Sequence, residues 1–304
     1  MNNENQQNLE DDIDLKELFL ALWSKKILIL SITSLAAIIT LLYSLSLPNI
    51  YSSHVLLAPT DPQDSLSSKL GGYSSIAGLA GISIPSNSGA KVTEAIERIK
   101  SFDFFVAQFL PNIKFENLVV AKEWNPATDT FNYNSEIFNK KDNEWVAKSI
   151  PSEQSAYAIY RSILNISEDK KTSFTSIHIQ HISPHIAQKW VKIIVQNINS
   201  HMRELDIKSA ENSIDFLNSR MKKTSLSEIK VAISNLLQDQ MKVLTLAESN
   251  KDYIFKLISS PMSPEKKSGP NRAQICILGT LSGLILSLII SLILHYFNVK
   301  KKVI

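Results

Sequence analysis

Two long apolar segments lie near the two ends of the chain, and the sequence between them is far more polar. The first covers residues 27–47 and the second covers residues 273–297, and neither contains Asp, Glu, Lys or Arg. An α-helix of about 20 apolar residues crosses the hydrocarbon core of a bilayer. We therefore predict a transmembrane helix in each segment.

Positive charge beside the first segment predicts the orientation of the chain. Lys25 and Lys26 precede this segment directly, whereas no Lys or Arg follows it until Lys69. Because positive residues collect on the cytoplasmic side of a span, we expect the N-terminus in the cytoplasm and residues 48–272 across the membrane. The second span then returns the C-terminus to the cytoplasm, in agreement with the lysines at 300–302.

Two short tails make up the expected cytoplasmic side. Residues 1–26 include an amphipathic helix whose apolar face carries Leu15, Leu18, Phe19, Leu22 and Trp23. The acidic leader and the absence of a small-residue cleavage motif favour a retained anchor over a signal peptide. The tail at 298–304 leaves no room for a kinase or cyclase domain, which argues against a transmembrane sensor.

The central segment predicts an α+β domain. Residues 172–181 alternate with period two, which is typical of a strand, and the turn EDKK before them predicts a hairpin. The expected elements are a strand at 51–58, a helix at 91–110, an irregular stretch at 121–150, a helix at 153–164, a hairpin of 164–167 with 172–181, and a strand at 253–258. We expect residues 48–183 to form a base with a mixed sheet, and residues 251–272 to hold the return strand and a proline-rich stretch.

A long helical arm is expected to protrude from this base over residues 184–250. The pair Ser183–Pro184 is a strong helix start, with Ser as N-cap and Pro at the first helical position. No Pro or Gly follows until after Lys222, so a continuous helix would be about 57 Å long. Ser225 and Glu228 are spaced as a capping box, which predicts that a second helix starts there.

The apolar stripe of this arm requires a partner, because it is too extended for a small base to cover. Its own return segment or a neighbouring subunit would supply that partner, and a parallel homo-oligomer is the expectation. The residues assigned to oligomer or arm contacts are Trp190, Ile194, Ile198, Leu205, Leu217 and Met221.

Small residues recur every four positions in both predicted spans. Such residues let helix backbones approach closely in lipid. We expect them to pack the two spans together or to contact another membrane protein. The residues assigned to this role are Gly279, Gly283, Ser287 and Ser291 in the second span and Ala36, Thr40 and Ser44 in the first.

Composition and motifs exclude several classes of function. The net charge is only +3 and there is no dense basic patch with interleaved aromatic residues, so we expect no nucleic-acid partner. Cys276, the one cysteine, lies inside the second predicted span, so the central segment contains no disulfide.

No catalytic or metal-binding set is recognisable. His178 and His181 would point to opposite faces of one strand, His185 opens the next helix, and no Asp, Glu or Cys completes a ligand set. Glu168 and Asp169 lie in the predicted hairpin turn, where solvated side chains are the simplest interpretation. We predict no metal, no cofactor and no enzymatic activity.

Four segments together resemble the Wzz-type polysaccharide co-polymerases, the O-antigen chain-length determinants. They are LKELFLALWSKKILIL at 15–30, GGYSSIAGLAGIS at 71–83, SIHIQHISPHIAQKWVKIIVQNIN at 176–199 and the stretch at 251–297. The most specific piece is the proline-rich approach to the second span, formed by Pro261, Pro264 and Pro270 and followed by a glycine-bearing helix. Members related to bacterial tyrosine kinases add a nucleotide-binding domain, which we do not expect here.

The resemblance implies an inner-membrane protein whose periplasmic part has an α/β base and a long helical arm. It also implies a ring-like homo-oligomer that controls, without catalysis, how many repeat units a polymerase adds to a lipid-linked glycan. The implied partners are further copies of the chain, a polysaccharide polymerase in the inner membrane and the lipid-linked glycan. On this basis the small residues of the spans become candidate polymerase contacts.

Two other classes of function stay open. One is an adaptor of a capsule or exopolysaccharide export system, or an activator of a separate tyrosine kinase. The other is a periplasmic ligand sensor. The genes beside this one would separate the first class from chain-length control, because polymerase and flippase genes would indicate chain-length control.

Overall fold

The computed structural model describes residues 22–60, 88–146 and 150–302. It divides into a helix-pair unit, residues 1–49 with 269–304, and a central unit, residues 50–268. The amphipathic helix expected at 15–23 lies mostly outside the described residues, and the glycine-rich segment at 71–83 lies wholly outside them.

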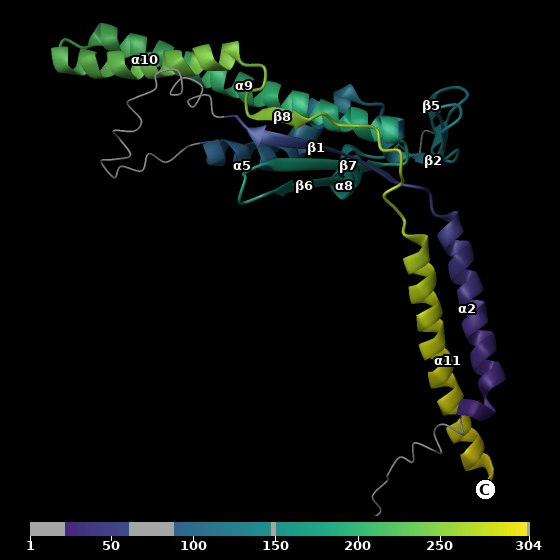
Figure 1. Ribbon diagram of the computed structural model, residues 1–304. Coiled ribbons are helices and arrows are strands. Elements are labelled where there is room, and N and C mark those ends of the chain that lie inside the picture. The colour runs from purple at the N-terminus through teal and green to yellow at the C-terminus, as the bar shows by residue number, and fades with distance from the viewer. Residues whose placement is uncertain (1–21, 61–87, 147–149, 303–304) are drawn as a thin grey trace, which may run out of the picture. The chain divides into compact units, whose positions relative to one another are not determined.

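The helix-pair unit consists of α2 (Lys26–Ser46) and α11 (Arg272–Lys302), which run side by side (Figure 1). Both helices are long and apolar enough to cross a membrane, over Lys26–Ser46 and Arg272–Leu294. Most of their large apolar side chains are exposed on the outside of the pair, where lipid would cover them. The second helix extends beyond the expected end of its span at residue 297.

The central unit is built on a four-stranded antiparallel sheet. Its strand order is β6 (Leu164–Glu168), β7 (Thr175–His181), β1 (Tyr51–Pro59) and β8 (Phe255–Ser259). All three neighbouring pairs are antiparallel, so the α+β class is confirmed but the expected mixed sheet is wrong. Long connections join β1 to β6 and β7 to β8, and β1 lies between β7 and β8 with both neighbours antiparallel to it.

Alternation along the strands places one face of this sheet in the core. Val55 and Leu57 of β1 and Ile177 and Ile179 of β7 are fully buried, whereas the residues between them are more exposed. The helices α5 (Ser88–Ile99), α8 (Glu153–Ile163) and α9 (Pro184–Lys223) pack against the same core. The hairpin that the period-two pattern predicted is therefore confirmed.

The single helix expected at 91–110 is wrong, because the chain breaks at Lys100–Ser101. Beyond the break come α6 (Phe102–Phe104), a π-helix (Phe105–Phe109) and a 3-10 turn (Leu110–Asn112). Two tyrosine hydroxyls of α8 donate to the carbonyls at the break, Tyr160 to Ile99 at 2.8 Å and Tyr157 to Lys100 at 2.5 Å. Partners from another helix thus satisfy the carbonyl groups that end α5.

The stretch expected to be irregular at 121–150 instead holds two small hairpins. They follow the short helix α7 (Phe115–Val119) and pair β2 (Ala121–Asn125) with β3 (Thr130–Tyr133), and β4 (Phe138–Asn139) with β5 (Glu144–Trp145). Trp145 packs against Phe138 and Phe115, with ring centroids 5.0 and 5.5 Å apart. These strands are too short to produce a clear alternation in the sequence.

The arm consists of α9 and of α10 (Ser227–Ser249), which returns beside the outer part of α9 (Figure 1). Ser183 caps α9, and its hydroxyl accepts the backbone N–H of Ile186 at 3.5 Å, as predicted. The capping box expected at Ser225 and Glu228 is wrong. The N-cap of α10 is Leu226, whose side chain makes no capping hydrogen bond. The helix starts after this residue because the backbone of Leu226 is still extended.

Candidate functional site

Small residues of α2 and α11 face each other in the helix-pair unit. A Cβ added at Gly279 would lie 2.8 Å from Cβ of Thr40 and closer still to its methyl group. A Cβ added at Gly283 would overlap Cβ of Ala36. Real side chains do not approach so closely, so glycine at these two positions sets the separation of the helices.

Serine hydroxyls continue this contact along the pair. Ser44, Ser287 and Ser291 are buried, and the hydroxyl of Ser287 lies 3.4 Å from that of Thr33. Thr33 was missed in the sequence, because it lies three residues before Ala36 and so falls outside the four-residue repeat of Ala36, Thr40 and Ser44. Among the described residues, the hydroxyls of Ser44 and Ser291 have no hydrogen-bond partner.

Arg272, at the start of α11, was also missed. Its guanidinium donates to the carbonyl oxygen of Leu47 and to the side-chain oxygen of Asn49, both at 3.2 Å. These bonds connect the first turn of α11 to the residues that follow α2. The sequence showed only a positive charge at this position, and no local pattern identified its partners.

The three prolines expected at the approach to the second span fall in both units. Pro261 and Pro264 belong to the central unit, and Pro270, which follows a cis peptide bond, belongs to the helix-pair unit. The carbonyl oxygen of Pro261 accepts a hydrogen bond from the side-chain amide of Gln188 at 2.9 Å. Within the central unit, the chain at Pro261 is therefore held to the first turns of α9.

Half of the residues assigned to oligomer or arm contacts lie inside the chain's own core. Trp190, Ile194 and Ile198 are fully buried against the sheet and the neighbouring helices, so of the two expected partners the chain itself covers this part of the stripe. Leu205 is partly buried and packs against the same core. The base covers more of the stripe than expected, because α5, α8 and the π-helix all pack on the side of the sheet that α9 covers.

Asn199 of α9 anchors the return strand to this core. Its side-chain oxygen accepts the backbone N–H groups of Ile254 and Phe255 at 3.0 and 2.9 Å, and its amide donates to the carbonyl of Phe255 at 2.8 Å. The residue is buried and all three bonds join segments that are far apart in sequence. It was missed because a single Asn in a polar helix has no pattern of its own.

The outer arm carries apolar side chains that the rest of the described chain does not cover. Leu217 and Met221, on the outer part of α9, are half-buried. Large apolar residues that remain exposed on the arm are Phe216, Leu226, Ile229, Val231, Leu236 and Met241. Exposed apolar groups in such number are typical of a surface that contacts another protein.

The histidines and carboxylates weighed as catalytic or metal-binding candidates do not converge. His178 stacks on His54 of β1, with ring centroids 5.3 Å apart, on the face of the sheet opposite to His181. Asp169 accepts backbone and side-chain hydrogen bonds in the hairpin turn, which lower its pKa. Within the described ranges no three His, Cys, Asp or Glu residues are placed to hold a metal ion.

His181 is a buried neutral imidazole with two fixed partners. Its Nδ1 accepts the backbone N–H of Ser183 at 3.0 Å, so Nε2 carries the proton that is donated to the carbonyl of Asn117 at 3.0 Å. Burial lowers the pKa of His181, and the accepting carbonyl of Asn117 only partly opposes this shift. Its role is to hold α7 beside the start of α9.

We expect the stability of the folded chain to fall as the pH drops below about 6.5, the ordinary histidine pKa. The lowered folded-state pKa means that the unfolded chain binds the proton first, so the free energy of unfolding decreases until the pH passes the folded-state pKa. Thermal unfolding of the detergent-solubilised chain between pH 8 and pH 5 measures this slope. His181→Gln should flatten it more than His185→Gln, a change at an exposed histidine; equal slopes in both variants would contradict the prediction.

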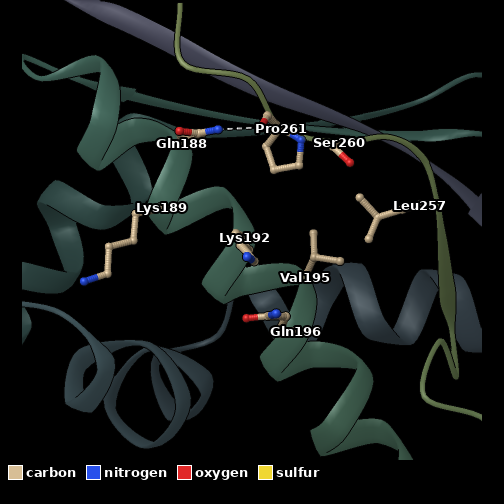
Figure 2. A pocket seen from close by; sticks show the side chains of 8 residues that line it. All are labelled: Gln188, Lys189, Lys192, Val195, Gln196, Leu257, Ser260 and Pro261. Atoms are coloured by element: carbon tan, nitrogen blue, oxygen red, sulfur yellow. Dashed lines mark hydrogen bonds between the residues drawn. The ribbon is translucent and has the colours of Figure 1, made fainter.

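A cavity of about 470 Å³ lies between α9 and the end of β8 (Figure 2). The side of α9 contributes Gln188, Lys189, Lys192, Val195 and Gln196, and the strand and the residues after it contribute Leu257, Ser260 and Pro261. Its volume is within the range of small-molecule sites. No sequence pattern predicted this cavity, because its two walls are about 65 residues apart in the chain.

The family comparison agrees with the resemblance seen in the sequence. Residues 11–105 match the Wzz family. The family is described as chain length determinant protein, and this match confirms the predicted resemblance for that part of the chain. In the described residues, the Wzz match includes α2, β1 and α5. With the two candidate membrane helices it supports an inner-membrane protein with a periplasmic domain.

Two solved structures are similar to this Wzz-like chain over much of its length. A full-length bacterial polysaccharide co-polymerase has 13% identity and a TM-score of 0.42, with 94% of this chain and 98% of that chain covered. A fragment of WzzB, a polysaccharide co-polymerase from Salmonella Typhimurium, has 14% identity and a TM-score of 0.33, with 73% and 100% covered. No curated protein matches the sequence significantly.

Proposed function

We propose that this protein regulates the chain length of O-antigen or a related surface polysaccharide without being an enzyme. The Wzz match at residues 11–105 is the observation that carries the proposal. Two candidate membrane helices and a central unit with a long arm agree with it.

The proposed mechanism is scaffolding of a polysaccharide polymerase in the inner membrane. Close packing at Gly279 and Gly283 would set the geometry of the membrane helices, and a polymerase helix would contact the same unit. The exposed apolar residues of α10 would contact neighbouring copies in a homo-oligomer. Chain length would then depend on how the assembly holds the polymerase and a lipid-linked glycan, and no bond would be made or broken by this chain.

Deletion of the gene followed by gel analysis of the surface polysaccharide tests this function. We expect the regulated ladder of lengths to become unregulated, and a plasmid copy of the gene to restore it. A ladder that is unchanged by deletion would contradict chain-length control. If deletion instead abolished export of all surface polymer, the result would favour the export adaptor.

We expect residue 200 to be periplasmic and both termini to be cytoplasmic. Lys25 and Lys26 before the first span provide the physical reason, because positive residues stay on the cytoplasmic side. Fusions of a compartment-sensitive reporter after Ser200 and at the C-terminus measure the two locations. A cytoplasmic signal from the Ser200 fusion would contradict this topology.

We expect the chain in mild detergent to assemble into more than two copies through its arm. Leu236 of α10 is 52% exposed, so Leu236→Glu should lower the assembly size by placing charge in an apolar contact. The matched control is Gln238→Glu, which adds the same charge at an exposed polar position of α10. Mass measurement distinguishes them, and a wild-type monomer at micromolar concentration would refute the proposed oligomer.

A further inference from the structure

The cavity between α9 and β8 has the construction of a binding site. Gln188, Lys192 and Gln196 are spaced by four residues, so they lie one above another on a single face of α9. Val195 is 3% exposed and forms an apolar floor beside them. Leu257 and Pro261 face this helix from the opposite wall (Figure 2).

One rim of the cavity is fixed by a hydrogen bond within the chain. The amide of Gln188 donates to the carbonyl of Pro261 at 2.9 Å and thereby joins α9 to the segment after β8 (Figure 2). Because the two walls are connected at this point, the opening does not depend on a loop closing over it. A preformed site binds at a lower entropic cost than one that must order on binding.

The lining carries positive charge and no negative charge. Lys189 and Lys192 both line the cavity, and no Asp or Glu does. In the part of the chain that the structure describes, the ion pairs within 4.0 Å involve other lysines and an arginine, and neither Lys189 nor Lys192 takes part. Lys189 extends away from the other lining residues, so Lys192 is the cation at the centre (Figure 2).

The other lining groups suit a ligand with hydroxyls and aliphatic C–H surfaces. The amide of Gln196 and the hydroxyl of Ser260 each offer both a donor and an acceptor, as a sugar hydroxyl does. Val195, Leu257 and Pro261 supply apolar surface for the C–H faces of such a ligand. No aromatic residue lines the cavity, so it lacks the stacking platform that nucleobases use.

We propose that this cavity binds an acidic saccharide, with the carboxylate on Lys192 and the sugar hydroxyls on Gln196 and Ser260. The lining suits hydroxylated anions in general, and the choice of a saccharide among them rests on the proposed function. The site would give the regulator a direct contact with an acidic sugar of the growing polysaccharide.

The test is a titration of the full chain in an uncharged detergent with a trigalacturonate, and with maltotriose as the neutral counterpart. We expect the acidic trisaccharide to bind and the neutral one to bind at least about tenfold more weakly, since a charge-assisted hydrogen bond is lost. Lys192→Gln should weaken trigalacturonate binding about tenfold and leave maltotriose unchanged. Lys170→Gln, at an exposed turn lysine outside the cavity, should leave both unchanged.

Several results would overturn the assignment. They are an absence of trigalacturonate binding, equal affinity for the two trisaccharides, and unchanged affinity in Lys192→Gln. Binding of phosphatidylglycerol vesicles that depends on Lys192, without trigalacturonate binding, would assign the cavity to a lipid headgroup and overturn the saccharide.

The outcome of this binding test is independent of the outcome of the test of the proposed function. A chain that sets the polysaccharide ladder but does not bind trigalacturonate would overturn only the cavity assignment. A chain that binds through Lys192 while gene deletion leaves the ladder unchanged would overturn only chain-length control.

Discussion

Gly283→Leu is expected to shorten or scatter the polysaccharide ladder while the protein stays in the membrane. A Cβ at this position already overlaps Cβ of Ala36, so a leucine side chain would hold α2 and α11 apart. Helices in lipid associate through close van der Waals packing, and a bulky side chain at the contact prevents that packing. The measurement is the ladder of each strain, with immunoblots of the membrane fraction.

The matched control for this prediction is Ser282→Leu. Ser282 is the neighbouring residue of α11, is also small, and is exposed on the outside of the pair. Leucine there should be tolerated, since lipid would surround it. Gly279→Leu should behave like Gly283→Leu because of its contact with Thr40. Normal ladders from both glycine variants would show that close packing of this pair has no part in chain-length control.

A scaffold and an enzyme also differ in how they respond to loss of single polar groups. We expect Glu168→Gln, Asp169→Asn and His178→Gln to leave the ladder nearly unchanged, because these residues lie at the exposed end of β6, in the hairpin turn and on the outer face of the sheet. Loss of the ladder from one of these changes, with normal protein level, would indicate a catalytic role and contradict the proposal.

Trp190→Ala is expected to destabilise the central unit by about 3–5 kcal/mol. Trp190 is 1% exposed and contacts Phe109 and His181, with ring centroids 5.6 and 4.7 Å away. Removal of the indole leaves a cavity where the π-helix, β7 and α9 meet. Denaturant unfolding of the detergent-solubilised chain, followed by circular dichroism, measures the change in the free energy of unfolding.

Lys208→Ala is the control for this prediction, since Lys208 is an exposed residue of the same helix. Its change should stay within about 0.5 kcal/mol. A loss of less than about 1 kcal/mol in Trp190→Ala would mean that the surrounding side chains collapse into the cavity or that Trp190 is not buried. Such a result would restore Trp190 as a candidate contact between subunits.

The sequence alone determined the features that depend on local pattern. Length and apolarity located both candidate membrane helices, alternation located the β6–β7 hairpin, and Ser183 with Pro184 located the start of α9. The small residues of the spans were also visible as a repeat. In each case the signal lies within about 20 consecutive residues and arises from the geometry of one helix or strand.

The tertiary structure alone decided what depends on partners that are remote in sequence. The break after α5 is satisfied by tyrosines of α8, Asn199 binds a strand more than 50 residues away, and the walls of the cavity come from α9 and β8. It also decided that Trp190, Ile194 and Ile198 are covered by the chain itself. A stripe of apolar residues shows that a helix must be covered, but it carries no information about which surface covers it.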